Sequence, residues 1–266
     1  EAVGAARALG VDVVVTDHHL PPKTLPDAAA VVDPQLPGGE ACRVLSGVGV
    51  ALMLASALEE CPPEELLPFY GDLAAIGTIA DIMPLTGVNR RIVRAGLSLL
   101  RETERPGLAA LLEECGLAEK EPAAENISFA VAPRLNAAGR MDSAAAALEL
   151  LLCEDPDEAR DWARALEEKN TARQKAEQEI LQSVLDTIAA DASYSADRLL
   201  VVWGRGYHPG VIGIVASRVV ERFGKPAIIV SIDENGEGRG SGRGLAGFSL
   251  CDAIAACADR LIRFGG

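Results

Sequence analysis

The sequence lacks the marks of membrane and secreted proteins. No apolar run approaches the ~20 residues that a membrane span needs. The first residues carry no signal peptide and have the pattern of a helix already under way. Internal repeats and low-complexity tracts are also missing. These absences favour a globular protein of the cytoplasm, with no membrane partner.

Cysteine is present, but not in a metal-binding or disulfide-forming pattern. None of the six cysteines forms a Cys-x-x-Cys pair, and no histidine stands at zinc-ligand spacing from them. Without a secretory signal, a disulfide framework is not expected. We therefore expect six reduced thiols, most of them buried. They are Cys42, Cys61, Cys115, Cys153, Cys251 and Cys257.

Positive charge is scarce overall, with 25 Lys and Arg against 39 Asp and Glu and a net charge of −14. Taken alone, this balance argues against nucleic acid as a partner. The acidity is uneven, however. Residues 147–192 carry 12 acidic and 5 basic side chains, and residues 101–125 carry 7 and 3, which together supply −11 of the −14. Residues 200–245 carry 6 basic and 4 acidic side chains, so a locally positive groove is not excluded.

The length and composition fit a globular chain of one large domain or two small ones. There are 266 residues, of which 49% are hydrophobic and 24% charged. A helix is predicted over residues 2–9, ended by Gly10. The near-continuous apolar run 11–16 predicts a buried parallel strand, and residues 29–33 a second strand closed by Pro34. Further helices are predicted over 48–58, 63–79, 89–101 and 106–115. This is an α/β region with a mostly helical later part.

The amino-acid composition changes near residue 143. Residues 143–152 are rich in Ala and Leu, and a run of strong helix formers without Gly or Pro then extends from Pro156 to about residue 190. At ~1.5 Å per residue such a helix spans ~50 Å, a length typical of a connection between two domains. The last segment returns to α/β. Its predicted elements are strands over 199–203 and 226–232, helices over 211–223 and 249–263, and a turn over 233–238.

Asp17-His18-His19 is the sharpest chemical feature, because it directly follows the first predicted strand. Ligand sites of open α/β sheets lie at the carboxyl ends of strands. Two of only three histidines stand here, and imidazole beside a carboxylate suits a divalent transition metal. The alternative is a polar turn after a strand. Asp81 stands in an otherwise apolar run, where a carboxylate must be paired or metal-bound unless it is a surface group near a helix end.

Two later segments combine donors for anions with small residues. Residues 132–141 hold Arg134, Asn136 and Arg140 among alanines and a glycine, which suits contact with phosphate, although a loop with ordinary surface arginines is the alternative. Residues 238–244 alternate Gly with Arg239, Ser241 and Arg243, so backbone amides and side chains would face an anion. A flexible glycine loop is the alternative there. Residues 206–210 form a second candidate turn, in which His208 is interpreted as structural.

In this order, the segments resemble the RecJ family of bacterial 5′-to-3′ single-strand-specific DNA exonucleases, within the DHH phosphoesterase superfamily. The resemblance is carried by Asp17-His18-His19, Asp81 and the segments 45–51, 136–141, 210–218 and 240–243, across nearly the whole chain. It implies an α/β, parallel-sheet DHH domain over 1–142, truncated at its N-terminus. A helical connector over 143–192 would join it to a smaller α/β DHH-associated domain over 193–266, truncated at its C-terminus.

The same resemblance implies a role for each motif. Asp17, His18, His19 and Asp81 would be catalytic, with His18 and Asp81 as ligands of Mn²⁺ or Mg²⁺. Asp17 would orient the site and His19 would lie near the scissile phosphate.

The phosphate-binding segments also take roles from the resemblance. Arg140 in the first domain, with Ser241 and Arg243 in the second, would hold the 5′-phosphate end. Arg134 and Asn136 would also contact the DNA. The cleft between the domains would admit one strand. The implied partner is single-stranded DNA, in repair and recombination, with a single-strand-binding protein or a helicase as further partners of a monomer.

The family's amino-terminal Asp-x-Asp-like motif has no counterpart here, because Glu1 and Asp12 are the only acids before Asp17. We therefore expect an internal fragment that does not hydrolyse single-stranded DNA by itself. Two alternatives stay open. One is a short-oligonucleotide or cyclic-dinucleotide phosphodiesterase of the same superfamily. The other is a non-catalytic replication scaffold related to it.

Overall fold

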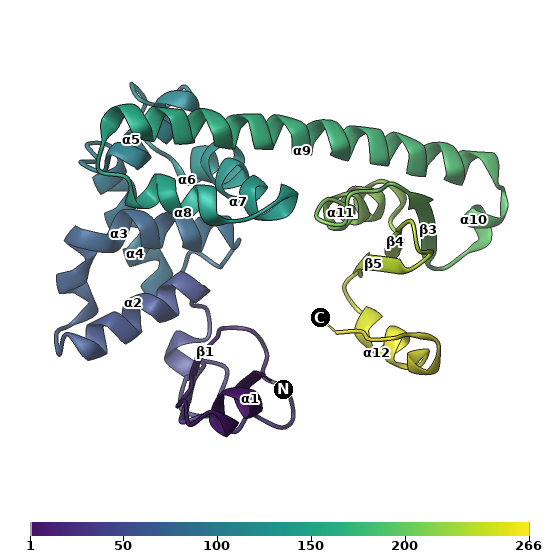
Figure 1. Cartoon of the computed structure of the whole chain (residues 1–266), viewed down its shortest axis with the longest axis horizontal. Helices are drawn as coiled ribbons and strands as arrows, with labels where there is room; N and C mark the ends of the chain where they lie inside the picture. The colour runs from purple at the N-terminus through teal and green to yellow at the C-terminus, as the bar shows by residue number, and fades with distance from the viewer. Residues whose placement is uncertain (1, 266) are drawn as a thin grey trace. The chain divides into compact units, whose positions relative to one another are not determined.

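The computed structural model describes residues 2–265, which divide into two compact units. The first unit comprises residues 2–136 together with Ala146–Ala165. The second comprises Ala137–Ala145 together with residues 166–265. The elements of both are labelled in Figure 1.

The first unit begins with a helix and two parallel strands. Helix α1 (Ala2–Ala8) is followed by Gly10 in the left-handed region, at φ +73°. Strand β1 (Val14–Thr16) pairs with β2 (Ala30–Val32) in parallel, as predicted. The expected burial is wrong, because Val14 is 57% exposed. Within residues 2–265 this sheet has only two strands, so it offers too little area for helices to cover both faces.

Four predicted helices follow and form the core of the first unit. They are α2 (Gly47–Leu58), α3 (Pro63–Ala80), α4 (Gly87–Leu100) and α5 (Pro106–Glu114). Leu45, Val50, Leu66 and Ile92 are buried where α2, α3 and α4 meet. The α3–α4 contact is close, since a Cβ on Gly96 would lie 2.0 Å from the carbonyl oxygen of Gly71.

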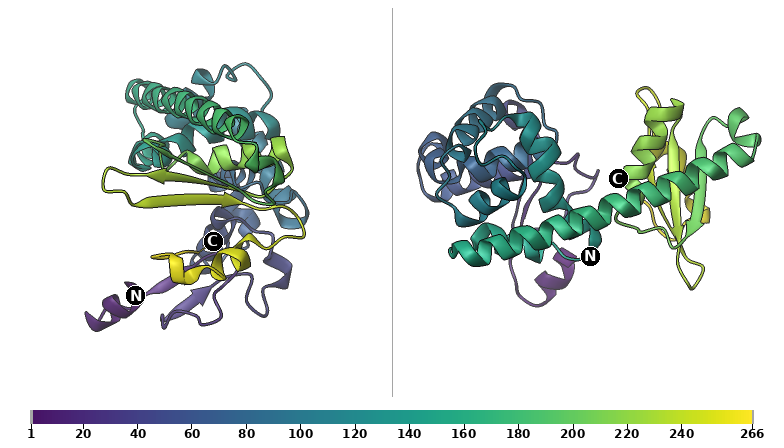
Figure 2. Two further views of the ribbon diagram at one scale, coloured as in Figure 1. Left: turned by 90° about the vertical axis from the view of Figure 1, so that its right-hand side faces the viewer. Right: turned by 90° about the horizontal axis from the view of Figure 1, so that it is seen from above.

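Helical structure continues through the segment that holds Arg134 and Arg140. A short α6 (Ala124–Asn126) leads into a π-helical turn η2 (Ile127–Val131), then α7 (Ala132–Met141) and α8 (Ala145–Leu152). The alternative of a loop over residues 132–141 is therefore wrong. Helix α9 (Pro156–Ala190) follows as one unbroken helix of 35 residues, as predicted (Figure 2).

The second unit is a three-stranded sheet with α11 against one face (Figure 2). Strand β3 (Leu200–Arg205) pairs in parallel with β4 (Ala227–Ile232), and β4 pairs antiparallel with β5 (Gly238–Arg243). Val202, Val215 and Ile229 pack with Ile180 and Val184 of α9 in one core. The other elements are α10 (Ser193–Ala196), α11 (Ile212–Phe223), α12 (Leu250–Ala255) and two short 3₁₀ turns, η1 (Glu40–Cys42) in the first unit and η3 (Ala258–Arg260) in the second.

The glycine-rich segment is not the flexible loop that was its alternative interpretation. Residues 238–243 form strand β5, not a loop, because the turn at Asp233 returns the chain alongside β4. The Asp233 Oδ1 atom accepts hydrogen bonds from the backbone N–H groups of Asn235 and Glu237, which closes that turn. The ladder with β4 then fixes the backbone despite the low strand propensity of glycine.

Two further expectations are also corrected. Helix α12 ends at Ala255, and the rest of residues 249–263 continues through turns such as η3. None of the six cysteines, all of which lie within residues 2–265, is buried or in a disulfide. Cys61 and Cys115 stand next to the ends of α2 and α5, where one side of the chain meets solvent. Among the described helices, none is long and apolar enough to cross a membrane.

Candidate metal centre and anion site

The carboxyl end of β1 presents Asp17, His18 and His19 together. The Asp17 N–H donates to the Val32 carbonyl at 3.0 Å, which extends the pairing with β2 by one residue. The Asp17 Oδ1 atom then accepts from the N–H of His18 at 2.7 Å, the N–H of His19 at 3.1 Å and Nδ1 of His19 at 2.8 Å. A short acidic side chain that satisfies the next two N–H groups is typical of a tight turn. The sequence thus fixes this turn locally.

These contacts set the charges of the two groups. The hydrogen bond from the His19 ring, with the two backbone N–H groups, lowers the pKa of Asp17 to about 2. The hydrogen bond to Asp17 raises the pKa of His19, and the negative charge of Asp17 adds to this effect. Asp17 is thus an anion at neutral pH, and His19 is an exposed imidazole held by one nitrogen.

Asp81 is held at the end of α3 by a strained turn. The N–H of Ile82 donates to Ile79 at 3.0 Å, and the N–H of Met83 donates to Thr78 at 3.3 Å. This is a Schellman cap, in which the residue after the cap is left-handed and usually glycine. Here that residue is Ile82, at φ +57°. A β-branched residue rarely adopts this conformation, so the backbone after Asp81 is strained.

His18 and Asp81 meet although 63 positions separate them. The Nε2 atom of His18 lies 3.5 Å from Oδ2 of Asp81, and the side chains are 15% and 41% exposed. Two atoms that each bind one Mg²⁺-sized ion at about 2.1 Å lie within about 4.2 Å of each other. The donor atoms of Asp17, His18 and His19 also lie within 4.8 Å of one another. His18 therefore links Asp81 to the cluster of Asp17 and His19; the carboxylate donors suit Mn²⁺ or Mg²⁺, and the imidazole donors a divalent transition metal.

Sequence reasoning missed a third acidic residue, which lies beside this cluster. Asp33 directly follows β2, the parallel neighbour of β1, and is only 9% exposed. Its Oδ1 atom accepts from the N–H of Gln35 at 2.8 Å. The Gln35 amide in turn donates to the His18 carbonyl at 3.2 Å and the Arg43 carbonyl at 2.9 Å. The strand-end rule that singled out Asp17 applies equally to Asp33, so the signal was present.

Buried polar contacts hold the elements around the cluster. The Ser46 hydroxyl caps α2 by accepting from the Gly49 N–H at 3.2 Å, and it lies 3.1 Å from the Thr78 hydroxyl. Thr78 lies on the last turn of α3, so the start of α2 is fixed to the end of the helix that carries Asp81. The Asn89 amide donates to the Pro84 carbonyl at 3.1 Å, and this hydrogen bond stabilises the loop between α3 and α4.

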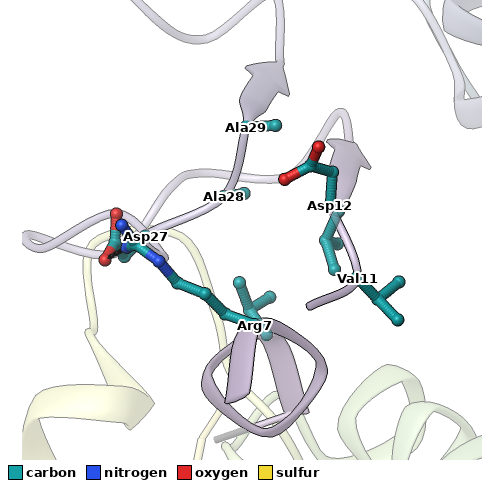
Figure 3. A pocket seen from close by; sticks show the side chains of 8 residues that line it. Arg7, Val11, Asp12, Asp27, Ala28 and Ala29 are labelled. Carbon is teal, nitrogen blue, oxygen red and sulfur yellow. Dashed lines mark ion pairs between the residues drawn. The ribbon is translucent and has the colours of Figure 1, made fainter. Parts of the chain in front are cut away.

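A small cavity lies at the opposite ends of the two strands. It has a volume of about 130 Å³ and is lined by residues that precede β1 and β2, with Arg7 of α1 (Figure 3). Arg7 forms an ion pair with Asp27 at its edge. Because the cavity is at the amino ends of the strands, it is separate from the Asp17 cluster.

The second unit brings together three of the predicted phosphate-binding residues. Ser241 and Arg243 of β5 lie over the first turn of α11, where a Cβ on Gly213 would be 2.9 Å from Ser241 Oγ and 3.1 Å from Arg243 Nη2. Arg243 Nη1 donates to Ser241 Oγ at 3.4 Å. Arg140 donates from Nη1 to the Gly210 carbonyl at 3.5 Å, just before α11. The amino end of a helix, a hydroxyl and guanidinium groups suit an anion.

The electrostatics of this group show an excess of positive charge. Burial lowers the pKa of Arg140, and the positive charges of Arg173 and Arg243 lower it further. Arg173 of α9 was not foreseen. It is 9% exposed and donates to Glu177 at 2.8 Å and to Asn170 at 3.0 Å. Its only sequence signal is a basic residue on the apolar stripe of α9, which does not reveal its neighbours.

The remaining predicted residues lie in the first unit, on α7. Arg134 Nη1 donates to the Ala130 carbonyl at 2.8 Å, so this guanidinium is partly engaged by its own helix. Asn136 is exposed, one helical turn before Arg140. The structure therefore groups Arg140, Ser241 and Arg243, while Arg134 and Asn136 are placed only on α7.

The chain was compared with known protein families and proteins. Residues 1–78 match the family described as "DHH family, N-terminal domain". The chain is 43% identical over 266 residues to the single-stranded-DNA-specific exonuclease RecJ of Bacillus subtilis, covering 98% of this chain and 33% of that protein. It is 38% identical over 281 residues to RecJ of Escherichia coli, covering 98% of this chain and 48% of that protein. The chain thus spans a third to a half of these relatives.

A solved structure agrees with the sequence relatives. RecJ of Thermus thermophilus in complex with Mn²⁺ superimposes with a TM-score of 0.84 at 38% identity, covering 99% of this chain and 39% of that chain. That protein has also been solved in complex with Mg²⁺. The α/β fold with its parallel sheet is shared with these structures. Both sequence relatives are named as single-stranded-DNA-specific exonucleases.

Proposed function

The chain is homologous to the RecJ exonucleases over nearly its whole length, and we propose that it supplies the catalytic part of a metal-dependent 5′-to-3′ exonuclease of single-stranded DNA. The observation that carries the proposal is the approach of His18 Nε2 to Asp81 Oδ2, at 3.5 Å, beside Asp17 and His19. Polar residues at a strand end and a distant helix end converge there. Such convergence is typical of a ligand site in an α/β fold.

In this proposal His18 and Asp81 hold the metal ion. When bound, Mn²⁺ or Mg²⁺ activates a water molecule and neutralises charge on the phosphate oxygens. Asp17 fixes the His19 ring through Nδ1 and raises its pKa, which favours the protonated ring whose Nε2–H would donate to a phosphate oxygen. Gln35 holds the His18 backbone, and the strained cap at Ile82 fixes the backbone that follows Asp81.

The second unit contributes the anion site. Ser241, Arg243 and Arg140 bind the terminal phosphate of the strand, and the first turn of α11 adds its backbone dipole. Burial and, after it, the positive charges of Arg173 and Arg243 lower the pKa of Arg140, and an anion bound between these guanidinium groups would stabilise their charges. Arg134 and Asn136 on α7 are proposed as further contacts to the strand.

The same proposal covers the organisation of the chain and its partners. Residues 1–142 belong to a DHH domain and residues 193–266 to a DHH-associated domain, with 143–192 as the connector that contains most of α9. The protein acts as a monomer on single-stranded DNA, with a single-strand-binding protein or a helicase as further partners. We also propose that it acts in the cytoplasm.

The first test measures Mn²⁺ binding by titration calorimetry. We expect His18→Ala and Asp81→Asn each to weaken binding at least about tenfold, because mutations at even the outer shell of a metal site weaken binding by about 10–100-fold. Asp12→Asn is the matched control, since Asp12 is an exposed carboxylate at the other end of the same strand. Unchanged Mn²⁺ affinity in both site variants would refute the ligand assignment.

The second test concerns turnover. In an enzyme that contains this chain in full, we expect His18→Ala to abolish nucleotide release from a 5′-phosphorylated single strand while sparing binding of the strand. Normal turnover by that variant would refute the proposed function.

A further inference from the structure

Helix α4 and the residue that caps its C-terminal end carry a row of arginines that the metal and anion sites do not use. Arg90, Arg94 and Arg101 are all exposed. At about 100° per residue, Arg94 and Arg101 lie within about 40° and 20° of Arg90 around the helix axis, so the three share one face. At a rise of about 1.5 Å per residue, the row extends over about 16 Å.

These arginines differ from their neighbours in having no acidic partner. Arg91, on the same helix, pairs with Glu64 at 3.0 Å, and Arg105 pairs with Asp72 at 2.9 Å. Within residues 2–265, the side chains of Arg90, Arg94 and Arg101 make no hydrogen bond or ion pair. In a chain with 39 acidic and 25 basic residues, three adjacent unpaired arginines are unexpected. Their positive charge is available to an anion.

The row lines a groove in the first unit, here called the α4 groove. Its volume is about 420 Å³, and the loop at Glu121–Ala124 forms its other side. Leu85, Val93 and Leu97 add apolar surface between the arginines. Glu121 is the one acidic residue among the lining residues, against three arginines, so the groove is positive on balance. In single-stranded nucleic-acid binding sites, positive side chains bind the phosphate backbone and neighbouring apolar surface contacts the bases. The α4 groove has both.

The groove and the metal centre lie close together along the chain. Leu85, which lines it, is four residues after Asp81 and is separated from it by at most about 14 Å of extended chain. A strand with one phosphate at the Asp81 cluster therefore has further phosphates within reach of Arg90. An acidic peptide would satisfy the same charges, but nothing links such a peptide to the metal centre.

We propose that Arg90, Arg94 and Arg101 bind the phosphate backbone of single-stranded DNA next to the metal centre. This inference rests on the proposed function, because it takes the polymer that the metal site acts on as the occupant of the groove. It assigns α4 a role in holding the strand, and it gives the chain a DNA contact on the first unit that is separate from the anion site of the second.

The test measures binding of a fluorescent thymidine homopolymer of about 20 nucleotides by anisotropy, with EDTA present so that the strand is not cleaved. Each phosphate contact on a single strand contributes about 0.7 to the slope of log K against log salt. The triple change Arg90→Ala, Arg94→Ala, Arg101→Ala should therefore flatten that slope by about 2 and weaken binding about 100-fold at 0.1 M salt. Arg94→Ala alone should weaken it about fivefold.

Arg91→Ala is the matched control, since it removes the same charge from the same helix outside the groove. Affinity of the triple variant equal to that of Arg91→Ala would overturn the inference. The inference would also be overturned if the triple variant kept DNA binding but lost binding of a poly-glutamate peptide, because the groove would then be a peptide site.

Mn²⁺ titration of the triple variant separates this inference from the proposed function. If the triple variant binds Mn²⁺ normally but binds DNA more weakly, the result supports the role of the arginines in DNA binding. If the wild-type chain binds DNA but no Mn²⁺, only the metal-ligand assignment is refuted.

Discussion

Replacing Ile82 with glycine tests whether backbone strain is stored beside the candidate metal centre. Ile82 is left-handed at φ +57° and its side chain is 86% exposed. The left-handed conformation costs an L-residue about 1–2 kcal/mol, and glycine removes this cost. Glycine also makes the unfolded chain more flexible, which offsets about 0.4–1 kcal/mol. Because little buried surface is lost, we expect Ile82→Gly to raise the free energy of unfolding by about 0.8 kcal/mol.

The assay is urea denaturation followed by circular dichroism, supported by a thermal melt. For a chain of this size the gain corresponds to a rise in Tm of about 2–3 °C. Glu60→Gly provides the matched control. Glu60 is also left-handed, at φ +54°, at the end of α2 and away from Asp81, but it is not β-branched. We expect its gain to be smaller, because branching at Cβ adds crowding.

Two results would refute this reasoning. A loss of stability in Ile82→Gly would show that the side chain makes contacts that outweigh the backbone strain. A gain no larger than that of Glu60→Gly would show that β-branching adds nothing at this position. A further Ile82→Ala variant removes the β-branching but keeps the left-handed penalty of an L-residue, so its stability should lie between those of the wild type and Ile82→Gly.

Two other predictions follow from single contacts. Arg105→Ala should lower the free energy of unfolding by about 3 kcal/mol, because it leaves the carboxylate of Asp72 buried without its cation, whereas Arg91→Ala should lower it by less than about 1 kcal/mol. Urea denaturation measures both, and equal losses would contradict the explanation. Gly213→Ala should weaken binding of a 5′-phosphorylated strand about tenfold, since the new Cβ displaces the Arg243 guanidinium and a hydrogen bond to a charged group is worth about 1.5–3 kcal/mol. A 5′-hydroxyl strand is the internal control, and an equal loss for both strands would argue against a terminal-phosphate site.

Local sequence signals predicted most of the elements. Gly10 ends α1, a run without Gly or Pro gives the unbroken α9, and a β-branched run gives β1. These signals depend on residues close in sequence, so one chain suffices to identify them. The turn at Asp17-His18-His19 is of the same kind, because its hydrogen bonds span at most two residues.

Other features depend on pairing between distant segments. Residues 238–243 have the composition of a loop, but the ladder with β4 makes them a strand. The apolar run of β1 predicted burial, yet exposure depends on how many strands and helices surround it. Propensity and periodicity carry no information about such neighbours.

In the candidate site, too, some features follow from the sequence and others only from the tertiary structure. The sequence and its family resemblance predicted the residues, His18 and Asp81 for a metal, and Arg140, Ser241 and Arg243 for an anion. Only the tertiary structure decided that His18 Nε2 lies 3.5 Å from Asp81 Oδ2 and that the buried Arg173 stands near Arg140. It also decided which arginines near α4 are neutralised, since Arg91 reaches Glu64 while Arg90 and Arg94 reach no acid within the described chain. Electrostatic and coordination energies depend on distances between atoms, and those distances are set by how the helices and strands pack.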